Sequence, residues 1–311
     1  MNKKLYTDFD IFTRALVNSR DVDPIYPVLK NIIQTFQFEP EWFTFVYVAF
    51  YNIESAIRMC NYMKTTKQWD EGLFRKLRQQ EITKFGHERR GTARNVDNQV
   101  RMFNDIVKFI EQIDNRKNPK MMLRNKTYYD TNHIFQEAIQ SLPFHSVWSS
   151  FKIAEIFEKS LGYEQFKIKD LGITGKDPNS TDGTIAGLRL LFGSDFKYNT
   201  DWYEIWNKFG IDLSKAYNYD IGEIETCFCK FNKLYSGNYY IGHDIDEFFE
   251  LKVLLGKSFY WLVENQFDYE VKELNKKEKT FYKNTGNILN SEYAIHTPSV
   301  DVIDVILELN I

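Results

Sequence analysis

Apolar positions recur at helical spacing along most of the chain. Residues return to one face every three or four positions in segments 6–19, 25–36, 96–113, 147–160 and 221–234, which predicts helices there. Segment 42–59 is apolar on nearly all faces, the pattern of a helix buried at the centre of a bundle. Gly and Pro, with 15 and 7 residues, are sparse. We therefore expect a mainly α protein, a compact multi-helix bundle of about ten helices with few or no strands.

Residues 176–193 change from turn formers into a short apolar helix that Gly193 ends. Gly183 and Gly187, with Ala186 beside them, leave one face nearly without side chains, so another backbone or a ligand can come close. Two interpretations stay open. The helix packs tightly on a neighbour, which the spacing alone favours, or its free N–H groups bind an anion such as phosphate. The anion site would comprise Ser180, Thr181, Asp182 and Gly183.

Residues 86–95 crowd charged side chains around a glycine. Arg89, Arg90 and Arg94 lie near the start of the helix predicted from residue 96. Guanidinium groups hold phosphate well because they stay charged and offer a planar pair of donors. The alternative is a solvated charged turn in which Glu88 neutralises one arginine. The sequence alone does not separate the two.

An acidic run follows His243, close to two tyrosines. Tyr239 and Tyr240 precede it, and Asp244 and Asp246 belong to it. Carboxylates here either cap a helix or act as a general base beside the histidine. Two residues spaced by two point about 200° apart on a helix, so only one aspartate can face a pocket. We expect Asp246 to face inward as the base and Asp244 to cap the first turn.

Charge, cysteine content and the lack of long apolar runs limit the classes of protein to which this chain can belong. The net charge is −3 and the pI about 6.0, so no global basic field indicates nucleic acid. Locally, residues 115–126 carry five Lys or Arg and are read either as a DNA-backbone contact or as a solvated connection. Three cysteines form neither a disulfide framework nor a zinc set. Without a signal segment or a long apolar run, we expect an intracellular protein that needs no membrane.

Five segments in order carry a family resemblance: 21–29, 42–56, 88–91, 177–193 and 239–247. Together they resemble the amino acid:DNA transferases of bacteriophages, also called α-glutamyl/putrescinyl thymine pyrophosphorylases. These proteins are regarded as distant relatives of helical, helix-hairpin-helix DNA glycosylases. The resemblance covers roughly residues 6–260. It implies one helical domain over 1–260, whose two lobes would divide near 114–127, and a C-terminal extension over 261–311.

In that family, 5-hydroxymethyluracil in phage DNA is pyrophosphorylated, and the transferase then displaces pyrophosphate with an amino acid or polyamine nitrogen. The resemblance therefore implies double-stranded DNA carrying modified uracil and a free amino acid or polyamine as partners, in the cytoplasm of the infected bacterium. It implies no required cofactor, although a divalent metal on the pyrophosphate is compatible with it. The chemistry needs a proton acceptor, a site for the leaving group and a base taken out of the stack.

The resemblance also implies roles for the residues above. The candidate proton acceptors are Asp246, Asp244, His243 and Glu88. The candidate pyrophosphate-binding residues are Arg89, Arg90, Arg94, Ser180, Thr181, Asp182 and Gly183. The candidate stacking residues are Tyr239, Tyr240, Trp148 and Tyr47. A base-excising glycosylase-like enzyme and a non-catalytic DNA-binding protein remain the alternatives.

Overall fold

The computed structural model describes residues 3–19, 21–80, 84–85, 94–115, 139–171, 183–193, 196 and 203–244. In these ranges the chain forms ten α-helices, two short 3₁₀ helices and no strand, which confirms the predicted mainly α class. No helix within them is both long and apolar enough to cross a bilayer. The likeness to helix-hairpin-helix glycosylases stays a prediction.

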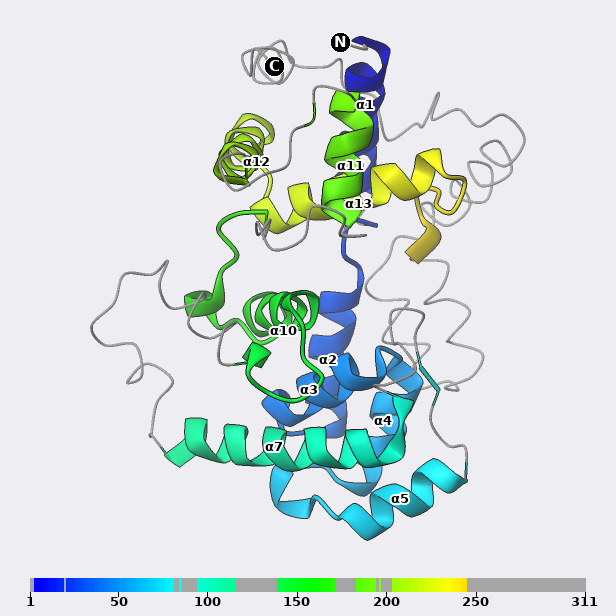
Figure 1. The fold of residues 1–311 in the computed structure, drawn as a ribbon, viewed down its shortest axis with the longest axis vertical. Helices are drawn as coiled ribbons and strands as arrows, with labels where there is room; N and C mark the ends of the chain where they lie inside the picture. Colours follow the sequence, from blue (N-terminus) through cyan, green and yellow to red (C-terminus); the bar gives the residue numbers. More distant parts are fainter. Residues whose placement is uncertain are drawn as a thin grey trace. The chain divides into compact units, whose positions relative to one another are not determined.

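The chain divides into two compact units (Figure 1). The central unit is residues 26–168, and the terminal unit combines residues 1–25 with 169–311. The terminal unit is thus built from both ends of the sequence. The expected division near 114–127 and the expected boundary at 260 fall mostly or wholly outside the described residues, so the domain limits stay a prediction.

In the terminal unit, α13 (Ile221–Tyr235) contacts α1 (Lys3–Asn18), α11 (Gly183–Phe192) and α12 (Tyr203–Tyr217) (Figure 1). Aromatic rings fill the space between α1 and α13. Phe9 stacks on Phe228 with ring centres 4.8 Å apart and meets Phe231 edge-on at 5.2 Å. Burial of such large rings supplies most of the favourable free energy of a helical core.

The glycines of α11 allow its close contact with α13. A Cβ on Gly187 would overlap the backbone carbonyl of Phe228, and one on Gly183 would overlap the sulfur of Cys229. The face without side chains therefore meets another backbone, as the packing interpretation expected. Gly193, with φ of +57°, follows the last residue of α11 in the left-handed region that glycine tolerates.

The central unit is organised around α3 (Pro40–Phe50). Every residue from Trp42 to Phe50 is buried, as expected for a central helix. α3 contacts α4 (Ile53–Tyr62), α7 (Val96–Asn115) and α10 (Val147–Lys159). The other elements are α2 (Ile25–Phe36), α5 (Glu71–Gln79) and the 3₁₀ helices η1 (Thr66–Gln68) and η2 (Glu164–Phe166).

The apolar pattern predicted one helix over segment 42–59, and this prediction was wrong. The segment consists of parts of two helices, α3 and α4. Tyr51 has φ of +48° and ends α3, and the side chain of Asn52 then accepts a hydrogen bond from the N–H of Ser55 at 3.0 Å. This is an N-cap, which starts a new helix in a new direction.

A buried carboxylate ties α10 to α2. Glu155 is fully buried, and its Oε2 accepts hydrogen bonds from the hydroxyl of Tyr26 at 2.6 Å and from Nζ of Lys152 at 2.5 Å. Ser160, just after α10, donates to the carbonyl oxygen of Tyr26 at 3.0 Å. Charge-assisted hydrogen bonds of this kind offset the cost of burying the carboxylate.

Candidate functional site

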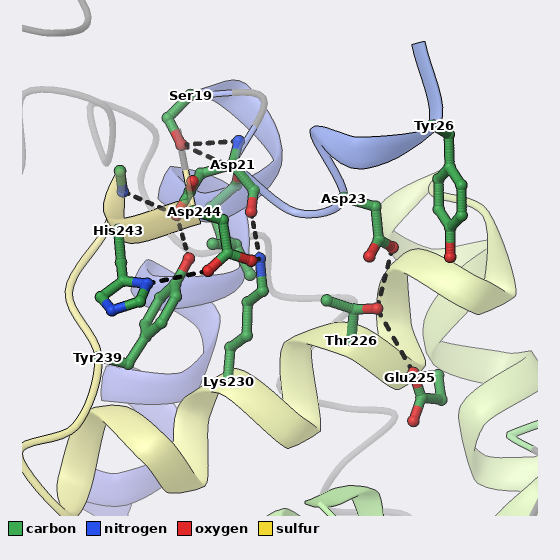
Figure 2. A network of polar contacts seen from close by, with 12 residues as sticks. Ser19, Asp21, Asp23, Tyr26, Glu225, Thr226, Lys230, Tyr239, His243 and Asp244 are labelled. Atoms are coloured by element: carbon green, nitrogen blue, oxygen red, sulfur yellow. Dashed lines mark hydrogen bonds and ion pairs between the residues drawn. The ribbon is translucent and has the colours of Figure 1, made fainter. Parts of the chain in front are cut away.

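Asp21 links the turn after α1 to the segment after α13. It is fully buried, and its N–H donates to the carbonyl oxygen of Leu16 at 3.2 Å. Its Oδ2 accepts a hydrogen bond from the hydroxyl of Tyr239 (Figure 2). The same oxygen accepts one from the N–H of Gly242 at 2.7 Å. Two segments more than 200 positions apart are thereby joined at one carboxylate oxygen.

Lys230 projects from α13 into the same cluster. Its buried Nζ donates to the carbonyl oxygen of Asp21 and forms an ion pair with Oδ2 of Asp244 at 2.7 Å (Figure 2). The ammonium also lies 5.2 Å from the ring centre of Tyr239. Burial disfavours the charged form, but the carboxylates of Asp244 and Asp21 outweigh it and raise the pKa of Lys230 well above its usual range.

His243 and Asp244 form a pair at the exposed side of the cluster. Nδ1 of His243 lies 3.0 Å from Oδ1 of Asp244, and the two side chains are 31% and 33% exposed. Burial alone would raise the pKa of Asp244, but the ammonium of Lys230, helped by His243, lowers it well below its usual range. An ionised carboxylate only accepts hydrogen bonds, so Nδ1 carries the proton. In the neutral ring Nε2 is then the basic nitrogen.

A second polar chain runs from the same turn to α11. The hydroxyl of Thr226 lies 2.9 Å from Oδ2 of Asp23 and 3.4 Å from Oε2 of Glu225 (Figure 2). The hydroxyl of Thr184, in the first turn of α11, donates to Oε1 of Glu225. A carboxylate thus lies beside the helix start for which an anion was one interpretation, and its charge disfavours a second anion there.

A model of the amino acid:DNA transferase family matches residues 17–240, well over half of the chain. This chain belongs to the amino acid:DNA transferase family. The family's name describes an enzyme that transfers an amino acid onto DNA. The match contains Asp21, Lys230 and Tyr239 and ends three residues before His243. Comparison with curated proteins and with solved structures finds no match.

The predicted stacking residues of this transferase differ in exposure. Tyr239 is 3% exposed, and its ring lies against Phe12, His243 and the ammonium of Lys230. The ring is therefore enclosed in this structure, and its stacking on a base stays a prediction. Tyr240 and, in the central unit, Tyr47 are also buried. Trp148, also in the central unit, is 36% exposed and meets Tyr51 edge-on at 4.9 Å, which leaves it as the better stacking candidate.

Arg94 is the described member of the predicted arginine cluster. It is exposed, and its guanidinium lies 5.5 Å from the ring centre of Phe85. Arg78, which the sequence did not single out, lies 4.7 Å from the same ring and donates to the carbonyl oxygen of Arg94 at 3.2 Å. Burial lowers the pKa of Arg78. The remaining predicted residues outside the described ranges are Glu88, Arg89, Arg90, Ser180, Thr181, Asp182 and Asp246.

Sequence reasoning missed Asp21 and Lys230 as site residues, although a signal existed for each. Asp21 begins the Asp-Val-Asp-Pro turn, which is part of the first segment that carries the family resemblance. Lys230 lies three positions after Cys227 and four before Leu234, both buried. This spacing puts a lysine on the apolar face of a helix, where a charge needs a partner.

The described parts of the transferase contain no candidate metal site. Within those ranges no three His, Cys, Asp or Glu side chains come together as a metal would require. Whether a divalent metal binds the pyrophosphate is tested below by experiment.

Proposed function

We propose that this transferase joins the nitrogen of an amino acid or amine to pyrophosphorylated 5-hydroxymethyluracil in DNA and releases pyrophosphate. The observation that carries the proposal is the family match over residues 17–240. The polar cluster of Asp21, Lys230 and Asp244 supports it, because it gives the terminal unit a charged, partly exposed site beside a histidine. The substrate would be phage DNA in the cytoplasm of an infected bacterium.

The reaction has a simple balance. The lone pair of the neutral amine forms a bond to the exocyclic methylene carbon, and the bond from that carbon to the pyrophosphate oxygen breaks. The electron pair of the broken bond leaves with pyrophosphate, and the nitrogen gives up one proton. An elimination–addition route would have the same balance. Either route needs a proton acceptor and stabilisation of the departing negative charge.

His243 suits the proton acceptor best among the described candidates. The carboxylate of Asp244 is a weak base because Lys230 lowers its pKa, whereas the imidazole of His243 keeps a basic nitrogen. Asp244 then serves to orient the ring, a role that differs from the expected helix cap. The backbone groups that it would cap lie beyond residue 244, outside the described residues. Asp246 and Glu88 remain proposed acceptors.

For the leaving group we propose Arg89, Arg90 and Arg94, because guanidinium groups form paired, charge-assisted hydrogen bonds to phosphate oxygens. We propose Trp148 as the stacking residue for a base taken out of the duplex, since its ring is exposed.

The test incubates the protein with DNA that carries pyrophosphorylated 5-hydroxymethyluracil and, in turn, each amino acid or polyamine. The DNA is digested to nucleosides for mass spectrometry, and released pyrophosphate is measured in parallel. Thymidines joined to an amino acid or polyamine through its nitrogen, formed one for one with pyrophosphate, support the proposal. Free base would identify a glycosylase, and unchanged DNA would identify a binding protein.

Two controls sharpen the result. DNA with unphosphorylated 5-hydroxymethyluracil should give no product, because hydroxide is a poor leaving group. A parallel reaction with a chelator, followed by added Mg²⁺, shows whether a divalent metal assists the departure of pyrophosphate.

A further inference from the structure

Lys230 contacts all three segments of the cluster and is its cationic member. Its ammonium contacts the carbonyl oxygen of Asp21 in the turn, lies over the ring of Tyr239 and pairs with Asp244, while its own backbone belongs to α13. The carboxylate that it neutralises is the one that contacts His243. We propose that Lys230 is a positioning residue for transfer, which holds Asp244 so that Asp244 orients the ring of His243.

The inference rests on the proposed function, because it assigns His243 as the acceptor of the amine proton. Lys230 contributes one positive charge, and the carboxylates that act on it, Asp244, Asp21 and Asp23, are negative. A proton on His243 would reduce this excess of negative charge. The cluster is therefore arranged to favour the charge that His243 gains when the amine is deprotonated.

Stability alone does not account for a lysine at this position. A buried ion pair contributes little relative to well-packed apolar side chains, because desolvation of both ions offsets their attraction. The apolar neighbours of Lys230 on α13, Cys227 and Leu234, show that a methionine would suit the surroundings of its stem. What a methionine could not do is fix the carboxylate of Asp244.

The ring of His243 has defined neighbours on each side. Tyr239 and Tyr240 lie with ring centres 5.5 and 5.2 Å from it, and Asp244 contacts Nδ1. These neighbours are bound in turn, Asp244 by Lys230 of α13 and Tyr239 by Asp21 in the turn after α1. Without the ammonium, Asp244 is free to turn toward water, because a third of its side chain is already exposed. The ring would then lose the partner that fixes its tautomer.

The test compares Lys230→Met, which removes the charge and the donor, with Lys230→Gln, which removes the charge and keeps a donor for the carbonyl of Asp21. Lys230→Gln decides the matter if Lys230→Met does not fold. The matched control is Lys233→Met, the same change at an exposed position of the same helix. Circular dichroism establishes that each variant is folded.

Two readouts are taken for each variant. The first is transfer, from which we expect kcat to fall roughly 100-fold with the KM for DNA little changed, since the loss is of orientation and not of binding. The second is the ¹⁵N spectrum of the protein labelled at histidine, without substrate. The chain has five histidines, so His243→Gln assigns the resonance. The wild type and Lys233→Met should show His243 protonated at Nδ1, and the Lys230 variants a mixture of tautomers.

The proposal requires both changes. A folded Lys230 variant that keeps either the wild-type kcat or the Nδ1-protonated tautomer would overturn it. Failure of the proposed function looks different, because the wild type itself would then yield no transfer product. The tautomer comparison needs no substrate, so it tests the hold of Lys230 on His243 in that case as well.

Discussion

One carboxylate oxygen of Asp244 pairs with Lys230 and the other contacts His243, so removal of this charge should lower the free energy of unfolding. Asp244→Asn leaves the ammonium of Lys230 with the carbonyl of Asp21 but without its ionic partner. We expect a loss of about 2 kcal/mol in the free energy of unfolding, below the full cost for a buried pair because Asp244 is partly exposed. Urea unfolding at pH 7 measures it.

The matched control for that change is Asp97→Asn. Asp97 also pairs with a cation, Arg75, but its side chain is 68% exposed. Exposed ion pairs contribute little, so the control should change the unfolding free energy by less than about 1 kcal/mol. Equal effects of the two substitutions would show that Asp244 behaves as an ordinary surface charge.

The same pair predicts a dependence on pH. Because the pKa of Asp244 is lowered in the folded state, its contribution is complete above the pKa of the unfolded carboxyl, about 3.9, and falls away as the pH drops through the folded value. Because the pKa of Lys230 is raised, its contribution is complete below about 10.4 and is lost only at higher pH. In a His243→Gln background, where the neighbouring imidazole does not titrate, the stability cost of Asp244→Asn should therefore be flat from about pH 5 to pH 9 and shrink below about pH 4. Unfolding curves across this range test the pattern, and a maximum confined near neutral pH would contradict it.

Arg89 and Arg90 carry the proposed contact with pyrophosphate. Replacement of either by Ala removes charge-assisted hydrogen bonds of about 1.5–3 kcal/mol each, so transfer should slow at least roughly tenfold. Arg75→Ala, which removes an arginine paired with Glu71 and Asp97, serves as the control and should keep the normal rate. If Arg89→Ala and Arg90→Ala are both as fast as the wild type, these arginines are surface charges.

At the scale of helices, the contact between α11 and α13 makes a sharp prediction. Gly187→Ala would push a methyl group into the backbone of Phe228, so the two helices must separate, with an expected cost of about 2–4 kcal/mol. Gly183→Ala instead meets mainly the side chain of Cys229, so Cys229→Ala should relieve part of its cost. Thermal unfolding of the single and double variants measures both effects.

Gly72→Ala is the control for these substitutions. Gly72 lies in α5, where a Cβ would meet only Oδ1 of Asp70 at 3.3 Å, and alanine favours the helix by up to about 1 kcal/mol over glycine. Its effect should be small. A Gly187→Ala variant as stable as Gly72→Ala would mean that α11 and α13 are not in close contact.

Local patterns were enough to predict several helices. Segment 25–36 is the range of α2, and segment 147–160 differs from α10 by one residue, because amphipathic spacing and, for α10, the Ser146 capping box mark the ends. The prediction of a single helix over segment 42–59 was wrong because apolar residues continue across the break between α3 and α4. The N-cap pattern of Asn52 and Ser55 marks the start of the second helix, but the apolar residues on both sides of it suggested one continuous helix.

The candidate site was predictable only in part, for a related reason. His243 and Asp244 are adjacent, so their pairing follows from a short segment. Asp21 and Lys230 are 209 positions apart, and their contact depends on how α1 packs against α13. Tyr239 was expected to stack on a base because tyrosines can, but only the fold shows its hydroxyl bound to Asp21.

At the scale of the molecule, the polar cluster joins two segments of the terminal unit that lie far apart in the sequence. Asp21 comes from residues 1–25, and Lys230, Tyr239 and Asp244 come from residues 169–311. In the sequence, residues 26–168 of the central unit come between the two segments that supply the cluster. A central unit produced alone would lack the cluster, and the terminal unit needs both segments to form it.

DNA binding by this acidic chain must depend on local positive charge. With 40 Lys and Arg against 43 Asp and Glu, the whole molecule repels the phosphate backbone weakly, so contacts must come from basic stretches. Residues 115–126, with five Lys or Arg and no Asp or Glu, form such a stretch. Most of it lies outside the described residues, and its contact with DNA is a prediction.

Replacement of those five residues by Gln should weaken binding to any duplex and flatten its dependence on salt. Each phosphate contact contributes about 0.9 to the magnitude of the slope of log K against log salt concentration, so this magnitude should fall by about 4.5 if all five take part. Fluorescence anisotropy with a short duplex at several salt concentrations measures it. Lys108→Gln with Lys215→Gln is the control, because each lysine already pairs with an aspartate on its own helix. If the control lowers the slope as much as the five-residue variant does, DNA binding depends on the total charge of the protein and not on residues 115–126.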